Sequence, residues 1–308
     1  MPPACSVIIP TYRRPDKLSR ALQALTKQTE KNFEVIVASD GPAGASLSVA
    51  RQFHSNFPSL RICERPHGGR AAIRNFGAGE AVSDLLIFID DDMRPTPDCI
   101  ASHLAHHASQ SDSILGGNQL EDLSLVQTDF QAYKALLSRQ WTRDFPSDRP
   151  LPKVSVFLTA AHFSIPRRTF QILKGFDERL TDCEDFEFAA RAHLTGIPIF
   201  FHKELIAWHD DFPTCRSYIS RKRQWSKARK VVFELNADLR ALFPERQSPR
   251  PNAIKKNFFR LLAQNRIVSA IDAERSILLI PKPIRFKIYE YVVAALGNYF
   301  VDIPLSDV

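Results

Sequence analysis

The chain has 308 residues, of which 44% are hydrophobic and 10% aromatic, and its 41 Lys and Arg residues against 34 Asp and Glu residues give a formal charge of +7. This composition excludes an intrinsically disordered chain, because a core can offset the conformational entropy lost on folding. The length fits one large α/β domain with an appendage, or two domains. The N-terminus has no basic region before a long apolar core, and no apolar run approaches the roughly 20 residues of a spanning helix, so secretion and membrane spanning are disfavoured.

The first ninety residues alternate short β-branched runs with segments of helical periodicity, as a parallel sheet covered by helices requires. Strands are predicted at residues 5–10, 33–38, 60–64 and 85–89, with helices through Leu18 to Leu25, Leu47 to Phe53 and Ala72 to Ala81. The last of these strands is the most apolar and is expected at the sheet centre.

The second half of the chain is less regular. A helix near 97–109 and a strand near 113–119 are followed by a helix end and loop over 133–152, a strand at 154–165, a helix at 184–194 and a strand at 197–208. Beyond about residue 214, no strand and two or three amphipathic helices are expected, with a Pro-containing linker at 243–251. We therefore predict a domain over 1–213 and a basic helical region over 214–308.

Three consecutive aspartates, Asp90, Asp91 and Asp92, follow the central strand. Like charges held this close repel one another, and a divalent cation relieves the repulsion. Carboxylate oxygens suit Mg²⁺ or Mn²⁺, and the carboxyl ends of strands are where open α/β sheets bind ligands. A solvated acidic turn is the alternative, and the apolar residues 87–89 before the cluster favour the metal site.

Neighbouring strand ends carry further polar groups. Asp40 could accept hydrogen bonds from a nucleobase or ribose or could belong to an ordinary turn, and the sequence PTYR at 10–13 offers an aromatic ring and hydroxyls. The sequence GGRAAIRN at 68–75 combines two glycines with a helix N-terminus, which favours an anion. It matches neither a dinucleotide-binding fingerprint nor a P-loop.

Taken in order, these motifs resemble the family-2 inverting glycosyltransferases of the GT-A fold. The resemblance covers about residues 5–208 and rests on VIIPTYRR, IVASDGP, GGRAAIRNFG, FIDDDM, GFDE and CEDFEFAARAHLTG. It implies an α/β, Rossmann-like, mostly parallel sheet flanked by helices, here with a C-terminal helical extension. It also implies an enzyme that moves one sugar from a nucleotide-sugar, a UDP-sugar in our reading, to a glycan or lipid-linked hydroxyl in polysaccharide biosynthesis.

The resemblance also implies roles for individual residues. The donor would be held by Pro10, Thr11, Tyr12, Arg13, Asp40, Arg70, Asn75, Asp90 and Asp91. Asp90 and Asp92 would form the ends of the DxD element, with Asp92 on Mg²⁺ or Mn²⁺ and Asp90 beside both metal and sugar. His209 stands where the family often supplies a metal-binding histidine, although a lone histidine is as often structural.

Inversion needs one base to take the acceptor proton, and the pair Glu184 and Asp185 matches the family's ED element, with Asp185 as the base. Acidic residues are also common at helix N-termini for capping alone.

His162 lies where the family places sugar contacts. His103, His106 and His107 have helical spacing without an acidic partner and are interpreted as a helix face. No C-x-x-C pair occurs among the five cysteines, so they indicate no zinc or redox motif, and a reduced, cytoplasmic compartment is expected.

Two alternatives stay open. A nucleotidyltransferase also places carboxylates on a metal at a strand end, but it would carry a Gly-rich loop with a Lys after the first strand. The other is an inactive basic protein that binds surfaces or nucleic acid. The sequence has the QxxRW-like run RKRQW at 221–225 but no membrane spans, which favours a non-processive transferase over a processive one.

Basic residues gather in the C-terminal region. Residues 216–230 hold seven Lys and Arg residues without an acidic one, and bases alternate with apolar residues at 254–262 and 280–299. Such helices could contact the inner face of the membrane peripherally, near a lipid-linked acceptor, or could pack on the catalytic domain. No nucleic-acid motif accompanies them, so no nucleic acid is expected as a partner.

Overall fold

The computed structural model describes residues 2–42, 44–152, 158–243, 252–274 and 276–305. It forms two compact units. The first comprises Met1–Asp122 and Gln140–Asp210, and the second comprises Leu123–Arg139 and Asp211–Val308. Leu123–Arg139 therefore groups with the C-terminal helices, whereas our division at residue 213 had placed it in the first domain.

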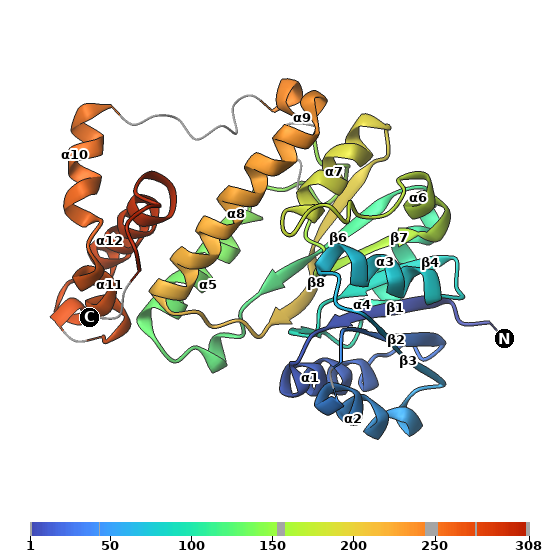
Figure 1. Cartoon of the computed structure of the whole chain (residues 1–308). Helices are drawn as coiled ribbons and strands as arrows, with labels where there is room; N and C mark the ends of the chain where they lie inside the picture. Colours follow the sequence, from blue (N-terminus) through green and yellow to red (C-terminus); the bar gives the residue numbers. More distant parts are fainter. Residues whose placement is uncertain (1, 43, 153–157, 244–251, 275, 306–308) are drawn as a thin grey trace. The chain divides into compact units, whose positions relative to one another are not determined.

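An eight-stranded sheet forms the centre of the first unit, in the order β3-β2-β1-β4-β7-β6-β8-β5 (Figure 1). Pairing is parallel along β3, β2, β1 and β4 and between β6 and β8, whereas β7 and β5 run antiparallel to their neighbours. The strands are β1 (Cys5–Thr11), β2 (Phe33–Asp40), β3 (Ser59–Arg65), β4 (Leu85–Ile89), β5 (Met93–Pro95), β6 (Ile114–Leu120), β7 (His162–Pro166) and β8 (Ile199–His209). The predicted mostly parallel sheet is present, with β4 inside it.

Helices cover both faces of this sheet because successive strand side chains point to opposite sides. Val7 and Ile9 of β1 share a core with α1, α2 and α4, whereas Ile8 faces α3. A Cβ at Gly77 would overlap the side chain of Ile8, so glycine there lets α3 lie close to the strand. The helices of this unit are α1 (Pro15–Thr26), α2 (Gly44–Gln52), α3 (Arg70–Glu80), α4 (Cys99–Ser109), α6 (Arg167–Ile172) and α7 (Glu184–Leu194).

Aromatic rings fill the α7 side of the central strands. Phe88 of β4 stacks on Phe163 of β7, with ring centroids 4.6 Å apart and planes within 4°. Phe170, Phe176 and Phe188 pack around this pair. The helix α7, whose first turn carries the ED pair, is thereby fixed against the strand that ends at the three aspartates.

Most predicted elements of this unit are present, and β4 and α7 have the predicted bounds. The short strand β5 and the helix α6 were missed, because three and six residues give too little periodicity to detect. The strand predicted at 154–165 begins only at His162, and residues 153–157 lie outside the described part.

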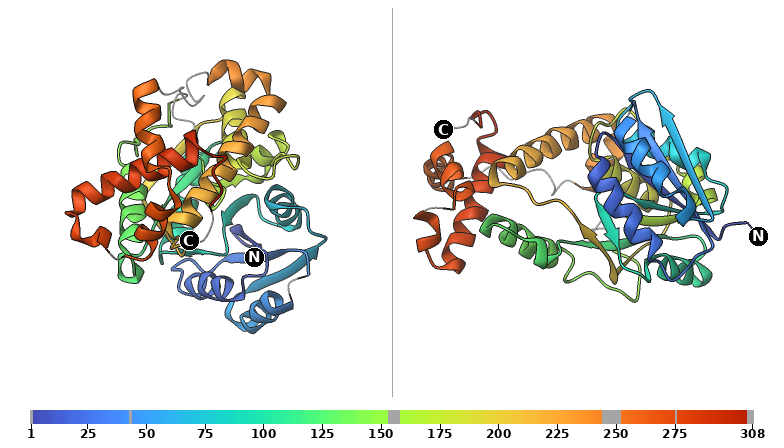
Figure 2. Two further views of the ribbon diagram at one scale, coloured as in Figure 1. Left: turned by 60° about the vertical axis from the view of Figure 1, so that its left-hand side comes forward. Right: turned by 90° about the horizontal axis from the view of Figure 1, so that it is seen from below.

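The regular secondary structure in the described residues of the second unit is helical. The part beyond residue 214, where helices and no strand were predicted, is orange to red in Figure 2. The described residues beyond 214 form five α-helices rather than the expected two or three: α8 (Cys215–Leu235), α9 (Ala237–Leu242), α10 (Ala253–Leu262), α11 (Asn265–Asp272) and α12 (Lys282–Ala294). The helix α5 (Asp129–Trp141) also belongs to this unit. Tyr289 and Val292 of α12 and Ile219 of α8 lie in one apolar core with Phe130 of α5.

An ion pair explains why α5 belongs to this helical unit. Asp129 at the start of α5 accepts from Arg285 Nε at 2.6 Å and Nη2 at 2.7 Å, and from the Tyr289 hydroxyl at 2.9 Å.

None of the helices within the described ranges combines the length and the hydropathy that crossing a bilayer requires.

Candidate functional site

The carboxyl ends of β1, β2 and β4 meet at one edge of the sheet. The register places Thr11 beside Ser39, and β4 lies on the other side of β1. The Thr11 hydroxyl donates to Asp91 Oδ2 at 2.7 Å. Parallel pairing therefore brings the PTYR segment and the three aspartates together, as the sequence predicted.

Arg74 of α3 joins this edge to the ED helix. Its Nη2 donates to both carboxylate oxygens of Asp90, at 2.7 and 2.9 Å, and its Nη1 donates to Glu184 Oε1 at 2.7 Å. Arg74 is only 4% exposed. Burial alone would lower the pKa of its guanidinium, but Asp90 and Glu184 outweigh that effect and raise it, so the cation persists in the interior. Residues 90 and 184 thus belong to one site.

Asp185 is the half-buried neighbour of Glu184 in the first turn of α7. Cys183, just before the pair, has a left-handed backbone with φ of 62°, which turns the chain sharply into the helix. Burial, with a further contribution from Glu184, raises the pKa of Asp185 to about 7. A carboxyl group that titrates near neutral pH can accept a proton in a reaction.

Asp92 is surrounded by bases. Arg14 Nη1 and Lys17 Nζ lie 3.1 and 3.2 Å from its Oδ2, and His209 Nε2 lies 3.7 Å from Oδ1. Burial acts to raise the pKa of Asp92, but His209, Lys17 and Arg14 together lower it. The backbone fixes the arrangement, because Asp210 N donates to the carbonyl of Asp92 at 2.8 Å.

Asp91 has the opposite electrostatic character. It is 4% exposed, and burial together with Asp92 raises its pKa to about 7. Its bond from Thr11 partly offsets that shift. Arg14 Nη1 lies 3.7 Å from Asp91 Oδ1, a longer contact than the cations make with Asp90 and with Asp92 Oδ2.

Asp40 holds the glycine loop that precedes α3. Its carboxylate accepts from Gly68 N at 2.8 Å and Gly69 N at 3.0 Å, and His67 Nδ1 lies 2.8 Å from Oδ2. His67 also stacks on Tyr12, with centroids 4.8 Å apart. Gly69 has φ of 87°, a conformation that favours glycine at this helix entry.

The remaining predicted donor residues differ in exposure. The amide of Asn75 donates to Phe176 O at 2.9 Å and accepts from Phe176 N at 2.9 Å, so it anchors the GFDE segment at 175–178. The Arg70 side chain is about half exposed and lies 3.8 Å from Asp182. Tyr12 is 41% exposed, and Arg13 lies over its ring.

The acidic site offers two close candidate ligands for a cation, Asp92 and His209. A carboxylate and an imidazole suit Mn²⁺, and Asp92 alone would suit Mg²⁺. Asp90 pairs with Arg74, and Asp92 Oδ2 pairs with Arg14 and Lys17, so a cation at Asp92 would compete with these two bases. Across the described part of the chain, the set of three Cys, His, Asp or Glu residues close enough to share one ion lies elsewhere, at Cys99, His103 and His162.

Sequence reasoning missed Arg74, Arg14 and Lys17. A signal for Arg74 was available, because it lies at helical spacing from Ala71 and Ala78 on the buried face of a helix, where an unpaired arginine would be costly. Arg14 and Lys17 lie one turn apart at the start of α1 and carry no comparable signal.

The expectation that His162 contacts the sugar is wrong. His162 is fully buried, and its Nε2 lies 3.2 Å from His103 Nε2 and 3.3 Å from Cys99 Sγ. The predicted helix face that carries His103 and His106 is likewise buried.

Residues 6–170 match the model of glycosyl transferase family 2, which covers more than half of the chain and contains the three aspartates. The chain belongs to this family. The family predicted from the motif order is therefore confirmed.

Relatives within the family match most of this chain. It is 30% identical over 243 residues to validoxylamine A glucosyltransferase of Streptomyces hygroscopicus subsp. jinggangensis, covering 70% of this chain and 57% of the relative. It is 34% identical over 259 residues to the uncharacterized glycosyltransferase YfnE of Bacillus subtilis, covering 69% and 66%. The chain thus spans little more than half the length of the first of these family members.

Solved structures show that the fold is GT-A, as predicted. The mannosyltransferase PcManGT from Pyrobaculum calidifontis, in complex with GDP-Man and Mn²⁺, aligns over 99% of this chain and 89% of its own, with a TM-score of 0.61 and 15% identity. TarS of S. aureus aligns over 94% and 53%, with a TM-score of 0.54 and 16% identity. At these identities the likeness concerns the fold.

Proposed function

We propose that this chain is a metal-dependent inverting glycosyltransferase that moves one sugar from a nucleotide-sugar to a hydroxyl of a glycan or a lipid-linked acceptor. One contact supports this proposal more than any other. Arg74 binds Asp90 and Glu184 together, so the DDD turn and the ED pair form a single acidic site. A helix-capping role alone would not require Glu184 to pair with an arginine that also holds a strand-end aspartate.

Asp92 and His209 would hold Mn²⁺ or Mg²⁺ in this reaction, and the bound ion would neutralise charge on the leaving diphosphate. Arg14 and Lys17, which contact Asp92, bring two further positive charges to the same place. They would bind the diphosphate oxygens and stabilise the negative charge that develops on them.

Asp185 would accept the proton of the acceptor hydroxyl as that oxygen bonds to the anomeric carbon. The carbon–diphosphate bond breaks on the opposite side, and the nucleoside diphosphate leaves with the bonding electrons. The pKa of about 7 allows Asp185 to be ionised before attack and to hold the proton afterwards. Glu184 would hold the guanidinium of Arg74 in place, and its negative charge would help to keep the pKa of Asp185 raised.

A UDP-sugar is our proposed donor. TarS of S. aureus has been solved with UDP and with UDP-GlcNAc, whereas PcManGT was solved with GDP-Man. The stacked Tyr12 and His67 rings lie at the end of β1 and present an aromatic surface suited to a base.

The test is a thermal-shift panel of UDP-, GDP- and dTDP-sugars with and without Mn²⁺ or Mg²⁺, followed by product analysis. One donor should protect the protein only with metal, and transfer should release the nucleoside diphosphate. Asp92→Ala should lose the metal-dependent protection, whereas Asp98→Ala, outside the site, should keep it. Pyrophosphate release, or normal turnover in Asp92→Ala, would contradict the proposal.

We also propose that α10 contacts an anionic membrane surface where a lipid-linked acceptor would be met. Ile254, Phe258 and Leu261 lie at helical spacing and are 82%, 44% and 68% exposed, although the adjacent Phe259 is buried in the unit's core. The exposed bases Lys255, Lys256 and Arg260 lie on the same helix. An apolar stripe with flanking bases is typical of interfacial helices.

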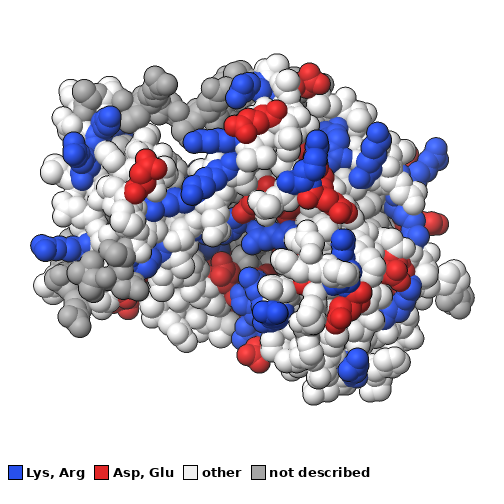
Figure 3. All heavy atoms as spheres, viewed as in Figure 1, with Lys and Arg blue, Asp and Glu red and all other residues white. Residues whose placement is uncertain are grey.

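This contact would place the protein peripherally at the inner face of the membrane. All five cysteines are free thiols, which fits a reducing compartment. On the face shown in Figure 3, Lys and Arg side chains alternate with carboxylates rather than forming one basic patch. The face shown therefore offers nucleic acid no continuous basic surface.

A further inference from the structure

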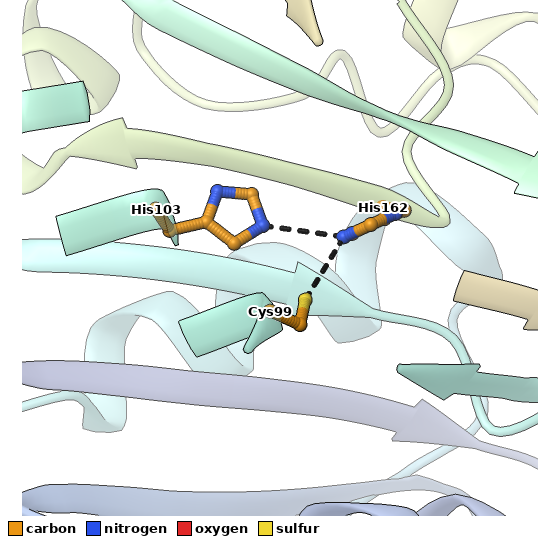
Figure 4. Close-up of side chains that lie close together, drawn as sticks. All are labelled: Cys99, His103 and His162. Atoms are coloured by element: carbon orange, nitrogen blue, oxygen red, sulfur yellow. Dashed lines mark hydrogen bonds between the residues drawn. The ribbon is translucent and has the colours of Figure 1, made fainter. Parts of the chain in front are cut away.

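Three buried side chains that the donor site does not use converge inside the first unit (Figure 4). Cys99 and His103 lie one turn apart on α4 and therefore face the same way. His162 begins β7, where it pairs with Ile89 at the end of β4. Each of the three side chains is at most 1% exposed.

Two distances among their ligand atoms are close to the edges of a metal coordination tetrahedron. His162 Nε2 lies 3.2 Å from His103 Nε2 and 3.3 Å from Cys99 Sγ, and all three atoms lie within 4.8 Å of one another. Tetrahedral Zn²⁺ with ordinary bond lengths places two nitrogens about 3.3 Å apart and a nitrogen and a sulfur about 3.6 Å apart.

Hydrogen bonds around the cluster can set the tautomer that a metal needs. His103 Nδ1 lies 2.7 Å from Ser164 Oγ, and the same hydroxyl lies 2.8 Å from His107 Nε2. If Ser164 donates its proton to His107, it accepts from His103 Nδ1–H, and the lone pair of His103 Nε2 then points at the cluster. Such support from a second layer of residues is typical of metal-bound histidines.

The fold also leaves room for the imidazole of His162 inside the unit, where the ring is fully buried. A Cβ at Gly117 would overlap the imidazole of His162, so glycine at this position is what admits the ring.

We propose that Cys99, His103 and His162 bind one Zn²⁺ ion that pins α4 to β7. A thiolate with two imidazoles is a borderline-soft set that suits zinc, in contrast to the oxygen-rich donor site. On binding, the Cys99 thiol loses its proton to solvent as the Zn–S bond forms, while both histidines bind through Nε2 lone pairs. A water molecule completes the tetrahedron.

The test uses the full chain stripped with EDTA and loaded with Co²⁺ as a spectroscopic substitute for zinc. One equivalent should give a thiolate-to-cobalt charge-transfer band, and added Zn²⁺ should abolish the band and raise the melting temperature. Cys99→Ser should lack the band, and Cys63→Ser, which removes a half-buried cysteine outside the cluster, should keep it.

Two further variants keep the proposal falsifiable if Cys99→Ser does not fold. Ser164→Ala should weaken Co²⁺ binding about 10–100-fold, as loss of a supporting hydrogen bond does. Asp92→Ala should retain the charge-transfer band, which separates this site from the donor site. A wild-type protein that shows no thiolate band, or binds Co²⁺ as tightly in Ser164→Ala, would overturn the proposal and identify the cluster as a hydrogen-bonded core.

Discussion

Arg74 in the first unit and Lys255 in the second are both basic residues on helices, but they differ in burial and therefore in how strongly their charges interact with their surroundings. Arg74 is 4% exposed and pairs with two carboxylates, whereas Lys255 is exposed beside an apolar stripe. Removing one member of a buried ion pair strands the other charge, while water and salt weaken an exposed charge. The formal charge of +7 therefore sums side chains with unequal effects on stability and binding.

Among the buried charges of the first unit, replacing Asp185 should have the largest effect on activity. Asp185→Asn should lower kcat by up to about 10⁴-fold, or about 5 kcal/mol in activation free energy, while donor-induced thermal protection persists. Steady-state transfer assays measure the first and melting curves the second. Glu204→Gln, an exposed carboxylate on β8, is the matched control and should leave kcat unchanged.

The same residue predicts a pH profile. Because burial raises the pKa of Asp185 to about 7, the group is protonated below this value, and the wild-type kcat should fall as the pH drops through it. The Asp185→Asn profile should be flat in this range. A wild-type rate that stays constant down to about pH 5 would contradict the role as base.

Arg74→Ala should lower the free energy of unfolding by about 3 kcal/mol. This is the lower end of the range for breaking a buried ion pair, because the Asp90 side chain is 24% exposed and water can partly solvate it. Urea denaturation measures this loss. Arg70→Ala is the control, and its half-exposed side chain should contribute less than about 1 kcal/mol. Equal losses in the two variants would show that burial does not distinguish these arginines.

Acid should destabilise the first unit through histidines outside the proposed zinc cluster. Burial lowers the pKa of His106 and of His107 to about 4, and also lowers that of His202, which faces His106 at 5.1 Å between ring centroids. The unfolded state therefore binds protons first, so their stabilising contribution is complete above about pH 6.5 and is lost as the pH falls toward 4.

Urea midpoints measured with EDTA at pH 7.5 and at pH 5 would test this acid sensitivity apart from any bound metal. His106→Asn should reduce the dependence on pH, whereas replacing the exposed His54 should not. An unchanged slope in His106→Asn would assign the acid sensitivity to other groups.

The smallest effect on stability is expected for the exposed bases of the second unit. Lys255→Gln with Lys256→Gln should change the unfolding free energy by no more than about 0.5 kcal/mol. Binding to vesicles that contain anionic lipid should nevertheless weaken by about 1 kcal/mol per base removed. Lys31→Gln, an exposed lysine of the first unit, is the control in vesicle sedimentation. Equal binding by all three proteins would contradict the membrane proposal for α10.

Other bases of the second unit are structural, which the sequence alone did not indicate. Arg223 of α8 donates to the backbone carbonyls of Leu296, Ile303 and Phe300 at 2.8 to 3.2 Å. Arg285 binds Asp129 of α5, and this pair spans 156 residues of sequence. The run of bases at 216–230, for which the sequence left open membrane contact or packing, therefore combines a structural arginine with exposed lysines.

The sequence by itself determined the family, the order of the main strands and helices, and the acidic motif at the end of β4. These features depend on local patterns: β-branched runs, helical periodicity, and aspartates that follow one another in the chain. Helix α7 and strand β4 could be bounded to the residue because apolar and turn-forming residues change sharply at their ends.

Only the tertiary structure decided which distant side chains meet. It joined Asp90 to Glu184 through Arg74, and it brought His162 to His103 and Cys99, which precede it by 59 and 63 residues. The lack of a C-x-x-C pair indicated no zinc motif, and the site proposed here is not visible in any local pattern because the fold brings α4 and β7 together. A buried polar group needs a hydrogen-bond partner, and the packing of the fold determines which groups lie close enough to serve as that partner.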